Sequence, residues 1–130
     1  MKVSIIGAGV MGKIFLASAL KVFPKARLII TDRDAAKLKK IKKEFPRAAV
    51  SLDNRSAIAQ ASLIILAVKP QSFDEAARGL KGRISARTLV LSIMAGVALK
   101  KIQGRLGVKK VIRAMPNLGA RVNKSMTVWI

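Results

Sequence analysis

The 130-residue sequence contains no cysteine, no histidine and no tyrosine. These absences exclude thiol nucleophiles, histidine general bases, catalytic tyrosines and the ordinary ligands of zinc. The remaining chemistry consists of carboxylates, hydroxyls, lysines and backbone amides, a set better suited to holding a reactive cofactor than to replacing one. We therefore name no catalytic residue and expect no metal site.

Long apolar runs are absent as well. Apolar residues make up 52% of the chain, but they fall in short runs such as residues 63–68 and 89–93, too short to span a bilayer. The first apolar run enters a glycine-rich turn at Gly7, too early for a secretory signal. Because neither a membrane span nor a secretory signal is recognised, we expect a cytoplasmic location. We also expect one domain, because a chain of this length can bury a core without disulfides or a metal.

Acidic residues are scarce. The chain has 6 Asp and Glu residues against 26 Lys and Arg residues, a formal net charge of +20. Such an excess attracts polyanions but does not determine a fold. A solvated basic surface is the simpler interpretation, and nonspecific nucleic-acid binding is the other.

Strand and helix patterns alternate along the whole chain. Strand-prone runs occupy residues 2–6, 27–31, 48–51, 63–68, 88–93 and 110–114, and a further β-like run starts at residue 127. Helical patterns lie between them at residues 11–23, 35–45, 56–61, 72–80 and 99–106. The alternation predicts an α/β fold over residues 1–130, a Rossmann-type doubly wound, mostly parallel sheet that binds ligands at the carboxyl ends of its strands.

A glycine-rich turn joins the first strand to the first helix. It reads Gly7-Ala8-Gly9-Val10-Met11-Gly12 and matches the pattern G-x-G-x-x-G. In this pattern the first glycine permits a tight turn, the second lets backbone amides approach a pyrophosphate, and the third lets helix and strand pack closely. Because the helix N-terminus then faces the anion, residues 7–12 are predicted to bind a dinucleotide.

Two charged residues follow the second strand. Asp32 lies 20 residues after Gly12, where an acid can accept hydrogen bonds from the adenosine ribose and so favour NAD. Arg33 favours NADP, because a guanidinium can stack on adenine and pair with a 2'-phosphate. The remaining lysines add a favourable field for the more anionic cofactor. We expect NADP, with NAD as the alternative.

Three further motifs follow the later strands in order. They are Ala67-Val68-Lys69-Pro70-Gln71, Ser92-Ile93-Met94-Ala95-Gly96 and Arg113-Ala114-Met115-Pro116-Asn117. Together with the glycine turn and Asp53-Asn54, they resemble the successive signatures of pyrroline-5-carboxylate reductase. The resemblance covers essentially the whole chain, and its specificity comes from the order of several motifs.

The resemblance implies roles for individual residues. Asn54 would contact the adenosine side of the cofactor, and Asn117 would order the floor of the nicotinamide pocket. Two short segments would surround the nicotinamide end: Val68, Lys69 and Pro70 would border its ribose, and Ala95 and Gly96 would line its pocket. For Ser92, Met94 and Met115 we favour core packing over contact with the cofactor.

The resemblance also implies an activity. It is that of an oxidoreductase of proline, and hence amino-acid, biosynthesis, which transfers hydride from NAD(P)H to the C=N carbon of 1-pyrroline-5-carboxylate. A protonated imine is already electrophilic, so the protein mainly positions the hydride. The family's helical C-terminal domain, which supplies the dimer interface and most substrate contacts, has no counterpart in the 130 residues. We therefore expect cofactor binding with little turnover unless a second domain or subunit completes the site.

Two alternatives stay open at this point. The cofactor domain of a β-hydroxyacid or prephenate dehydrogenase-like enzyme would share the glycine turn but should lack the later signatures. A stand-alone nucleotide-binding or nucleic-acid-associated Rossmann domain is compatible with the charge, since fold alone does not assign function. The apolar residues 128–130 lead us to expect self-association, as in a homo-oligomer.

Overall fold

A single seven-stranded sheet organises the part of the chain that the structure describes. The computed structural model describes the backbone of residues 1–116 and 126–129, and the side chains of residues 1–114. The strand order is β3-β2-β1-β4-β5-β6-β7; neighbouring strands from β3 to β6 are parallel, and β7 pairs antiparallel with β6. The strands are β1 (Lys2–Ile6), β2 (Arg27–Thr31), β3 (Ala49–Ser51), β4 (Leu63–Leu66), β5 (Leu89–Ser92), β6 (Val111–Pro116) and β7 (Met126–Trp129).

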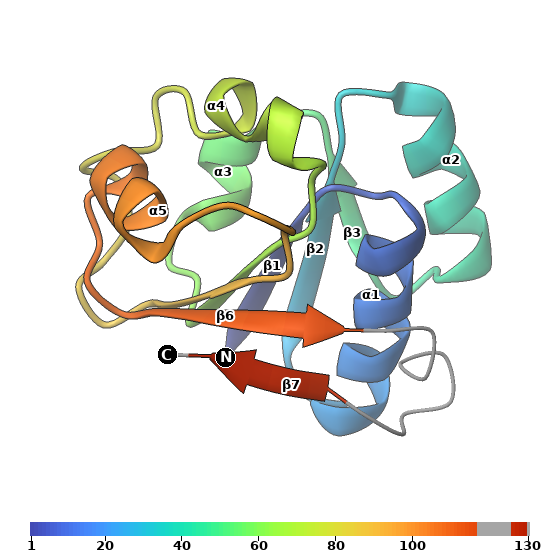
Figure 1. Ribbon diagram of the computed structural model, residues 1–130. Helices are drawn as coiled ribbons and strands as arrows, with labels where there is room; N and C mark the ends of the chain where they lie inside the picture. Colours follow the sequence, from blue (N-terminus) through green and yellow to red (C-terminus); the bar gives the residue numbers. More distant parts are fainter. Residues whose placement is uncertain (117–125, 130) are drawn as a thin grey trace.

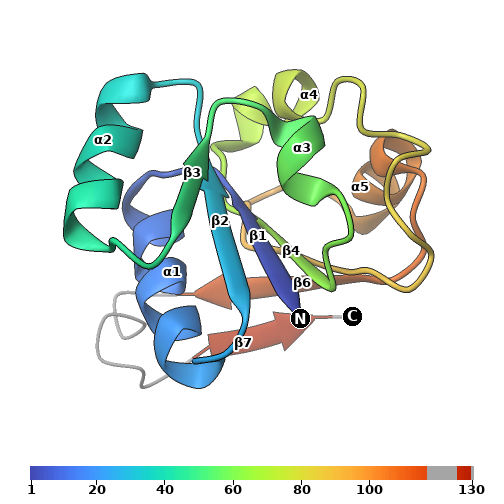
Figure 2. The ribbon, with the colours of Figure 1, turned by 180° about the vertical axis from the view of Figure 1, so that it is seen from behind.

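Helices cover both faces of this sheet (Figures 1 and 2). One face carries α1 (Val10–Val22) and α2 (Ala35–Glu44); the other carries α3 (Asn54–Ile58), α4 (Phe73–Ala76) and α5 (Leu99–Leu106), with a 3-10 turn, η1 (Pro70–Ser72), before α4. The arrangement confirms the predicted doubly wound α/β fold. Among the described residues, no helix has the length and apolarity needed to cross a membrane.

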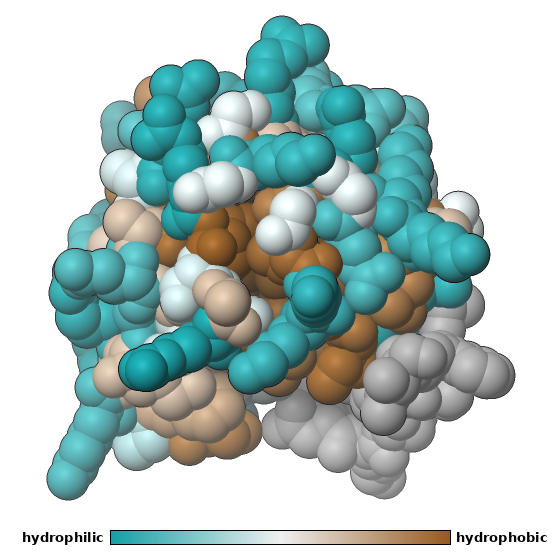
Figure 3. Space-filling view, turned by 90° about the vertical axis from the view of Figure 1, so that its left-hand side faces the viewer, coloured by the Kyte–Doolittle hydropathy of each residue, from teal (hydrophilic) through white to brown (hydrophobic). Residues whose placement is uncertain are grey.

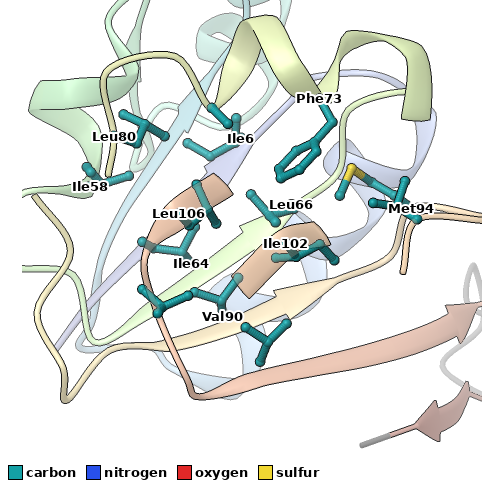
Figure 4. Close-up of a cluster of buried hydrophobic side chains, with 14 of the residues drawn as sticks. Ile6, Ile58, Ile64, Leu66, Phe73, Leu80, Val90, Met94, Ile102 and Leu106 are labelled. Atoms are coloured by element: carbon teal, nitrogen blue, oxygen red, sulfur yellow. The ribbon is translucent and has the colours of Figure 1, made fainter. Parts of the chain in front are cut away.

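Alternation along the strands divides the core into two clusters. On β1, Ile5 packs with Leu16 of α1 and Ile41 of α2, whereas the next residue, Ile6, packs with Phe73 and Ile102 on the other face. Figure 4 shows the second cluster, in which side chains from α3, α4 and α5 meet those of β4 and β5. Because successive strand residues point to opposite faces, strands buried on both sides read as continuous apolar runs.

Two helices differ from their predicted extents by more than one residue at an end. The helix predicted at residues 72–80 is too long: α4 ends at Ala76, and Gly79 has a φ of +77°, which a right-handed helix does not contain. The helix predicted at residues 56–61 begins earlier, at Asn54, because the side chain of Asp53 caps it by accepting a hydrogen bond from the Arg55 backbone N–H at 3.0 Å. Its end is set before Gln60, whose φ is +59°.

The carboxyl ends of the parallel strands are aligned in one row. The register pairs join the last residues of β3, β2, β1, β4 and β5, which are Ser51, Thr31, Ile6, Leu66 and Ser92, and continue to Arg113 within β6. The glycine turn, Asp32 and the segment that begins at Ala67 each start one residue beyond this row. The strand order also reverses between β1 and β4, and such a switch point is where doubly wound sheets bind ligands.

Two helical glycines should respond in opposite ways to alanine. A Cβ at Gly12 would lie 2.0 Å from the Gly7 carbonyl oxygen, so Gly12→Ala should lower the free energy of unfolding by about 2 kcal/mol or more. A Cβ at Gly104, within α5, would meet nothing within 4 Å, so Gly104→Ala should raise the free energy of unfolding by up to about 1 kcal/mol. Urea denaturation followed by circular dichroism measures both. Equal effects in the two variants would contradict the packing at Gly12.

Candidate functional site

A cavity of about 360 Å³ opens at the carboxyl edge of β1, β2 and β4. Its walls come from the glycine turn, from the turn that joins β2 to α2, from the start of α3, from the segment after β4 and from α4. Roughly this volume is typical of sites for small molecules and cofactors. The cavity therefore lies where the sheet topology predicts a ligand.

The three glycines of the turn have different surroundings. Gly7 has a φ of +111°, and a Cβ on it would lie 2.7 Å from the carbonyl carbon of Ala67. Gly12 is more crowded still, because a Cβ on it would lie 2.0 Å from the Gly7 carbonyl oxygen. A Cβ on Gly9 would meet no atom within 4 Å, and Gly9 lines the cavity. Gly7 and Gly12 are thus needed for packing, whereas the free space at Gly9 is on the ligand side.

The N-terminus of α1 reaches the cavity without a side-chain cap. Gly9 is its N-cap residue, and the first turn of the helix contains no acid. By contrast, Asp34 and Asp53 cap α2 and α3 with their own carboxylates. Uncapped N–H groups and the helix dipole together favour an anion at this end of α1.

The carboxylate of Asp32 forms hydrogen bonds with both the glycine turn and the turn after β2. Its Oδ2 accepts a hydrogen bond from the Ala8 backbone N–H at 2.9 Å, and its Oδ1 accepts one from the Asp34 N–H at 2.8 Å. Each carboxylate oxygen can accept more than one hydrogen bond, so contact with a ribose hydroxyl is still open to Asp32. This structural role was not predicted, because motif spacing does not show which N–H groups a carboxylate meets.

Asn54 links three elements around the cavity. Its Oδ1 accepts a hydrogen bond from Thr31 Oγ1 at 2.5 Å, and its Nδ2 donates one to the Ala76 carbonyl oxygen at 3.1 Å. The side chain therefore holds the end of β2, the start of α3 and the end of α4 in fixed relation. It lines the cavity, as its predicted role beside the adenosine requires.

An ion pair joins the two rims of the cavity. Arg33 Nη1, in the turn after β2, lies 2.8 Å from Glu75 Oε2 on α4. Both residues line the cavity, and their side chains are 73% and 61% exposed. Glu75 was not predicted to belong to the site, because 42 residues separate it from Arg33 and only the fold brings the two together.

The structure brings about half of the predicted cofactor residues to this cavity. Those that line it are Gly7, Gly9, Asp32, Arg33, Asn54, Val68 and Lys69. Those outside its lining are Ala8, Val10, Met11, Gly12, Pro70, Ala95 and Gly96. Ala95 and Gly96 are exposed just beyond β5, at the same edge of the sheet. Asn117 lies outside the described residues, and all these contacts remain predictions.

Further lining residues were not predicted. They are Ile6, Thr31, Lys37, Leu52, Ala67, Ser72, Glu75 and Ala76. Ile6, Thr31 and Ala67 stand next to predicted residues, so a wider window around each strand end would have included them. Ser92 and Met94 are 1% and 3% exposed, which agrees with the core packing predicted for them.

Comparison with known proteins identifies similar chains. A family described as NADP oxidoreductase coenzyme F420-dependent matches residues 2–96. Pyrroline-5-carboxylate reductase from Synechocystis is 36% identical over 129 residues, covering 98% of this chain and 48% of that protein. The structure of a pyrroline-5-carboxylate reductase from Coxiella burnetii has a TM-score of 0.83 at 26% identity, covering 97% of this chain and 47% of its own.

These comparisons confirm the predicted resemblance and the predicted fold. The chain spans about half the length of the curated relatives it matches. A prephenate dehydrogenase from A. aeolicus, solved with NAD⁺, has a TM-score of 0.76 but 18% identity, covering 97% of this chain and 44% of its own. That likeness shows the fold alone, so the dehydrogenase alternative is not better supported than the resemblance.

Asp32→Ala should destabilise the fold even without a ligand. Loss of the carboxylate leaves the Ala8 and Asp34 N–H groups without their acceptor, at a cost of about 1–3 kcal/mol in the free energy of unfolding. Asp74→Asn is the matched control, because the Asp74 side chain is 59% exposed and makes only ion pairs worth under about 1 kcal/mol. Urea titration of both variants distinguishes them, and an unchanged midpoint for Asp32→Ala would contradict the role of its carboxylate.

Proposed function

The chain belongs to the NADP oxidoreductase coenzyme F420-dependent family, and we propose that it forms the dinucleotide-binding part of a pyrroline-5-carboxylate reductase. The observation that carries this proposal is the open space at Gly9, where the uncapped N-terminus of α1 meets the cavity. The reaction would be hydride transfer from NAD(P)H to 1-pyrroline-5-carboxylate, a step of proline biosynthesis in the cytoplasm.

The residues present fit a dinucleotide along the carboxyl edge of the sheet. The backbone at Gly7 and Gly9 and the N-terminus of α1 would hold the pyrophosphate, which is anionic. The turn after β2 would hold the adenosine ribose, and Val68 and Lys69 after β4 would border the nicotinamide ribose. The bound cofactor supplies the hydride, while this chain binds and orients it.

NADP is the cofactor that the rim of the cavity favours. Arg33 and Lys37 both line it, and they give the adenosine end two cations suited to a 2'-phosphate. The carboxylate of Asp32 can still accept a ribose hydroxyl and so opposes this preference, but the dipoles of the two backbone N–H groups that it accepts from offset part of its negative charge. We therefore propose NADP over NAD.

The substrate half of the reaction needs more than these residues. The chain spans about half the length of its curated relatives and has no His, Tyr or Cys. We propose that a further domain or a second copy of the chain completes the substrate site, and that the functional form is a homo-oligomer. The imine would bring its own proton, so the completed site would mainly position the imine carbon against the hydride donor.

Charge favours a second candidate function, nonspecific association with nucleic acid. All six acidic side chains are engaged: Asp32, Asp34 and Asp53 accept backbone N–H groups, and Glu44, Asp74 and Glu75 pair with cations. Most of the 26 Lys and Arg residues therefore have no acidic partner in the described structure. Figure 3 shows one side of the molecule, where hydrophilic side chains surround a hydrophobic depression. Binding of this kind would rest on counterion release and weaken steeply with salt.

Gly9→Asp should separate folding from cofactor binding. A Cβ at this position meets no protein atom within 4 Å, and Asp is a preferred N-cap residue, so thermal stability should stay the same or rise. Its carboxylate would repel the pyrophosphate, weakening NADPH binding by at least about 100-fold, or about 2.7 kcal/mol. Fluorescence titration measures the affinity, and Gly9→Ala, which adds volume without charge, should lose less. A Gly9→Asp variant that titrates like the parent would place the cofactor elsewhere.

The isolated 130-residue chain should bind cofactor yet reduce pyrroline-5-carboxylate very slowly or not at all. Without groups that hold the imine carbon close to the nicotinamide, up to roughly 7–11 kcal/mol of positioning is lost. Steady-state NADPH oxidation measures turnover, with light scattering in parallel to give the mass. Turnover of about 1–10³ per second, as in an ordinary enzyme, from a monomer would show that the chain holds a complete site.

A further inference from the structure

The ion pair between Arg33 and Glu75 places a carboxylate beside the cation suited to a 2'-phosphate. Arg33 Nη1 lies 2.8 Å from Glu75 Oε2, and both side chains line the cavity. A guanidinium that holds a phosphate bidentately needs its N–H groups free of other acceptors. In this structure one of those groups is directed at Glu75 instead.

We propose that Glu75 lowers the preference for NADP over NAD, by competing with the 2'-phosphate of NADP for Arg33. The inference rests on the proposed function and adds to it a residue from α4 that no motif of the sequence marks. When NADP binds, Arg33 must leave Glu75 or share its donors with it. When NAD binds, no 2'-phosphate is present and the ion pair can stay intact. Glu75 therefore weakens NADP binding selectively and narrows the preference between the cofactors.

The exposure of the pair makes this exchange feasible. Both side chains are more than half exposed, at 73% and 61%, so water screens their attraction and each partner can be solvated when they separate. A buried pair would instead leave an uncompensated charge when broken. The competition is consequently modest in size, and it should be visible as a shift in relative affinity and not as a loss of binding.

The adjacent residue offers a matched control. Asp74 stands on the same helix, is 59% exposed, and pairs with Arg105 at 3.2 Å and with Lys101 at 3.6 Å. Both of its partners belong to α5, and Asp74 does not line the cavity. Asp74→Asn removes the same charge as Glu75→Gln from the next position. Any effect of net charge alone would appear equally in both variants.

The test uses two adenosine probes that lack nicotinamide, together with the whole cofactors. Isothermal titration of adenosine 2',5'-bisphosphate and of 5'-AMP, at one fixed ionic strength, isolates the contribution of the 2'-phosphate. Glu75→Gln should tighten binding of the bisphosphate about two- to fivefold, the upper part of the range that an exposed ion pair contributes, and change binding of 5'-AMP by less than about 1.5-fold. Asp74→Asn should change neither probe by more than about 1.5-fold. NADPH and NADH should follow the same pattern.

A double variant identifies the route of the effect. In the Arg33→Ala background, Glu75→Gln should no longer favour the bisphosphate, because the cation for which Glu75 competes is gone. Equal tightening of both probes, an unchanged ratio, or a full gain without Arg33 would each overturn the inference. If the parent binds NADPH and NADH but the ratio does not move, only the inference fails. If the parent binds neither, the proposed function fails with it.

Discussion

The packing of the glycine turn against the end of β4 is the constraint on which the site depends. A Cβ at Gly7 would approach the Ala67 carbonyl carbon to 2.7 Å, and one at Gly12 would approach the Gly7 oxygen to 2.0 Å. Backbone therefore lies directly on backbone, and α1 begins close to the carboxyl edge of the sheet. That closeness brings the uncapped N-terminus of α1 to the cavity. Between these two glycines lies Gly9, where a Cβ would meet no atom within 4 Å. Gly9 therefore marks the face of the turn that a ligand can approach.

This basic chain has few carboxylates, and three of them accept hydrogen bonds from backbone N–H groups at the ends of β2 and β3. Asp34 and Asp53 begin the helices that follow β2 and β3, and Asp32 joins the glycine turn to the turn after β2. Each replaces water as the acceptor for a backbone N–H group at a strand end. The six acids are outnumbered by 26 Lys and Arg residues, so the overall electrostatic field of the chain still attracts an anionic ligand. The excess of cations and the preference for a dinucleotide are therefore compatible.

Much of the fold could be predicted, because apolar runs and helical spacing record burial directly. Strands β1 and β2 and helix α5 occur at the predicted residues, and the glycine turn lies where its pattern requires. The extents of α3 and α4 could not be predicted, since they depend on the Asp53 cap and on left-handed backbone at Gln60 and Gly79. For the site, motifs after strand ends mark one edge of the sheet, which parallel register then aligns. Contacts between distant turns, such as that of Arg33 with Glu75, leave no local pattern.

The cavity thus combines two kinds of binding surface with different physical properties. Its floor is backbone, fixed by glycine packing and by the hydrogen bonds of Asp32 and Asn54, so it is organised before a ligand arrives. Its rim is made of long side chains in an exposed ion pair, which water and salt weaken. Because a rigid floor is ordered when the chain folds, binding does not have to order it. The floor can therefore supply affinity for the pyrophosphate, the part that all dinucleotides share. Under the proposed competition between Glu75 and the 2'-phosphate, a rearrangeable rim would supply little affinity but would respond to the group that distinguishes NADP from NAD. Recognition of the cofactor class and discrimination within it would then be separable, and sequence change at the rim would alter the second without disturbing the fold.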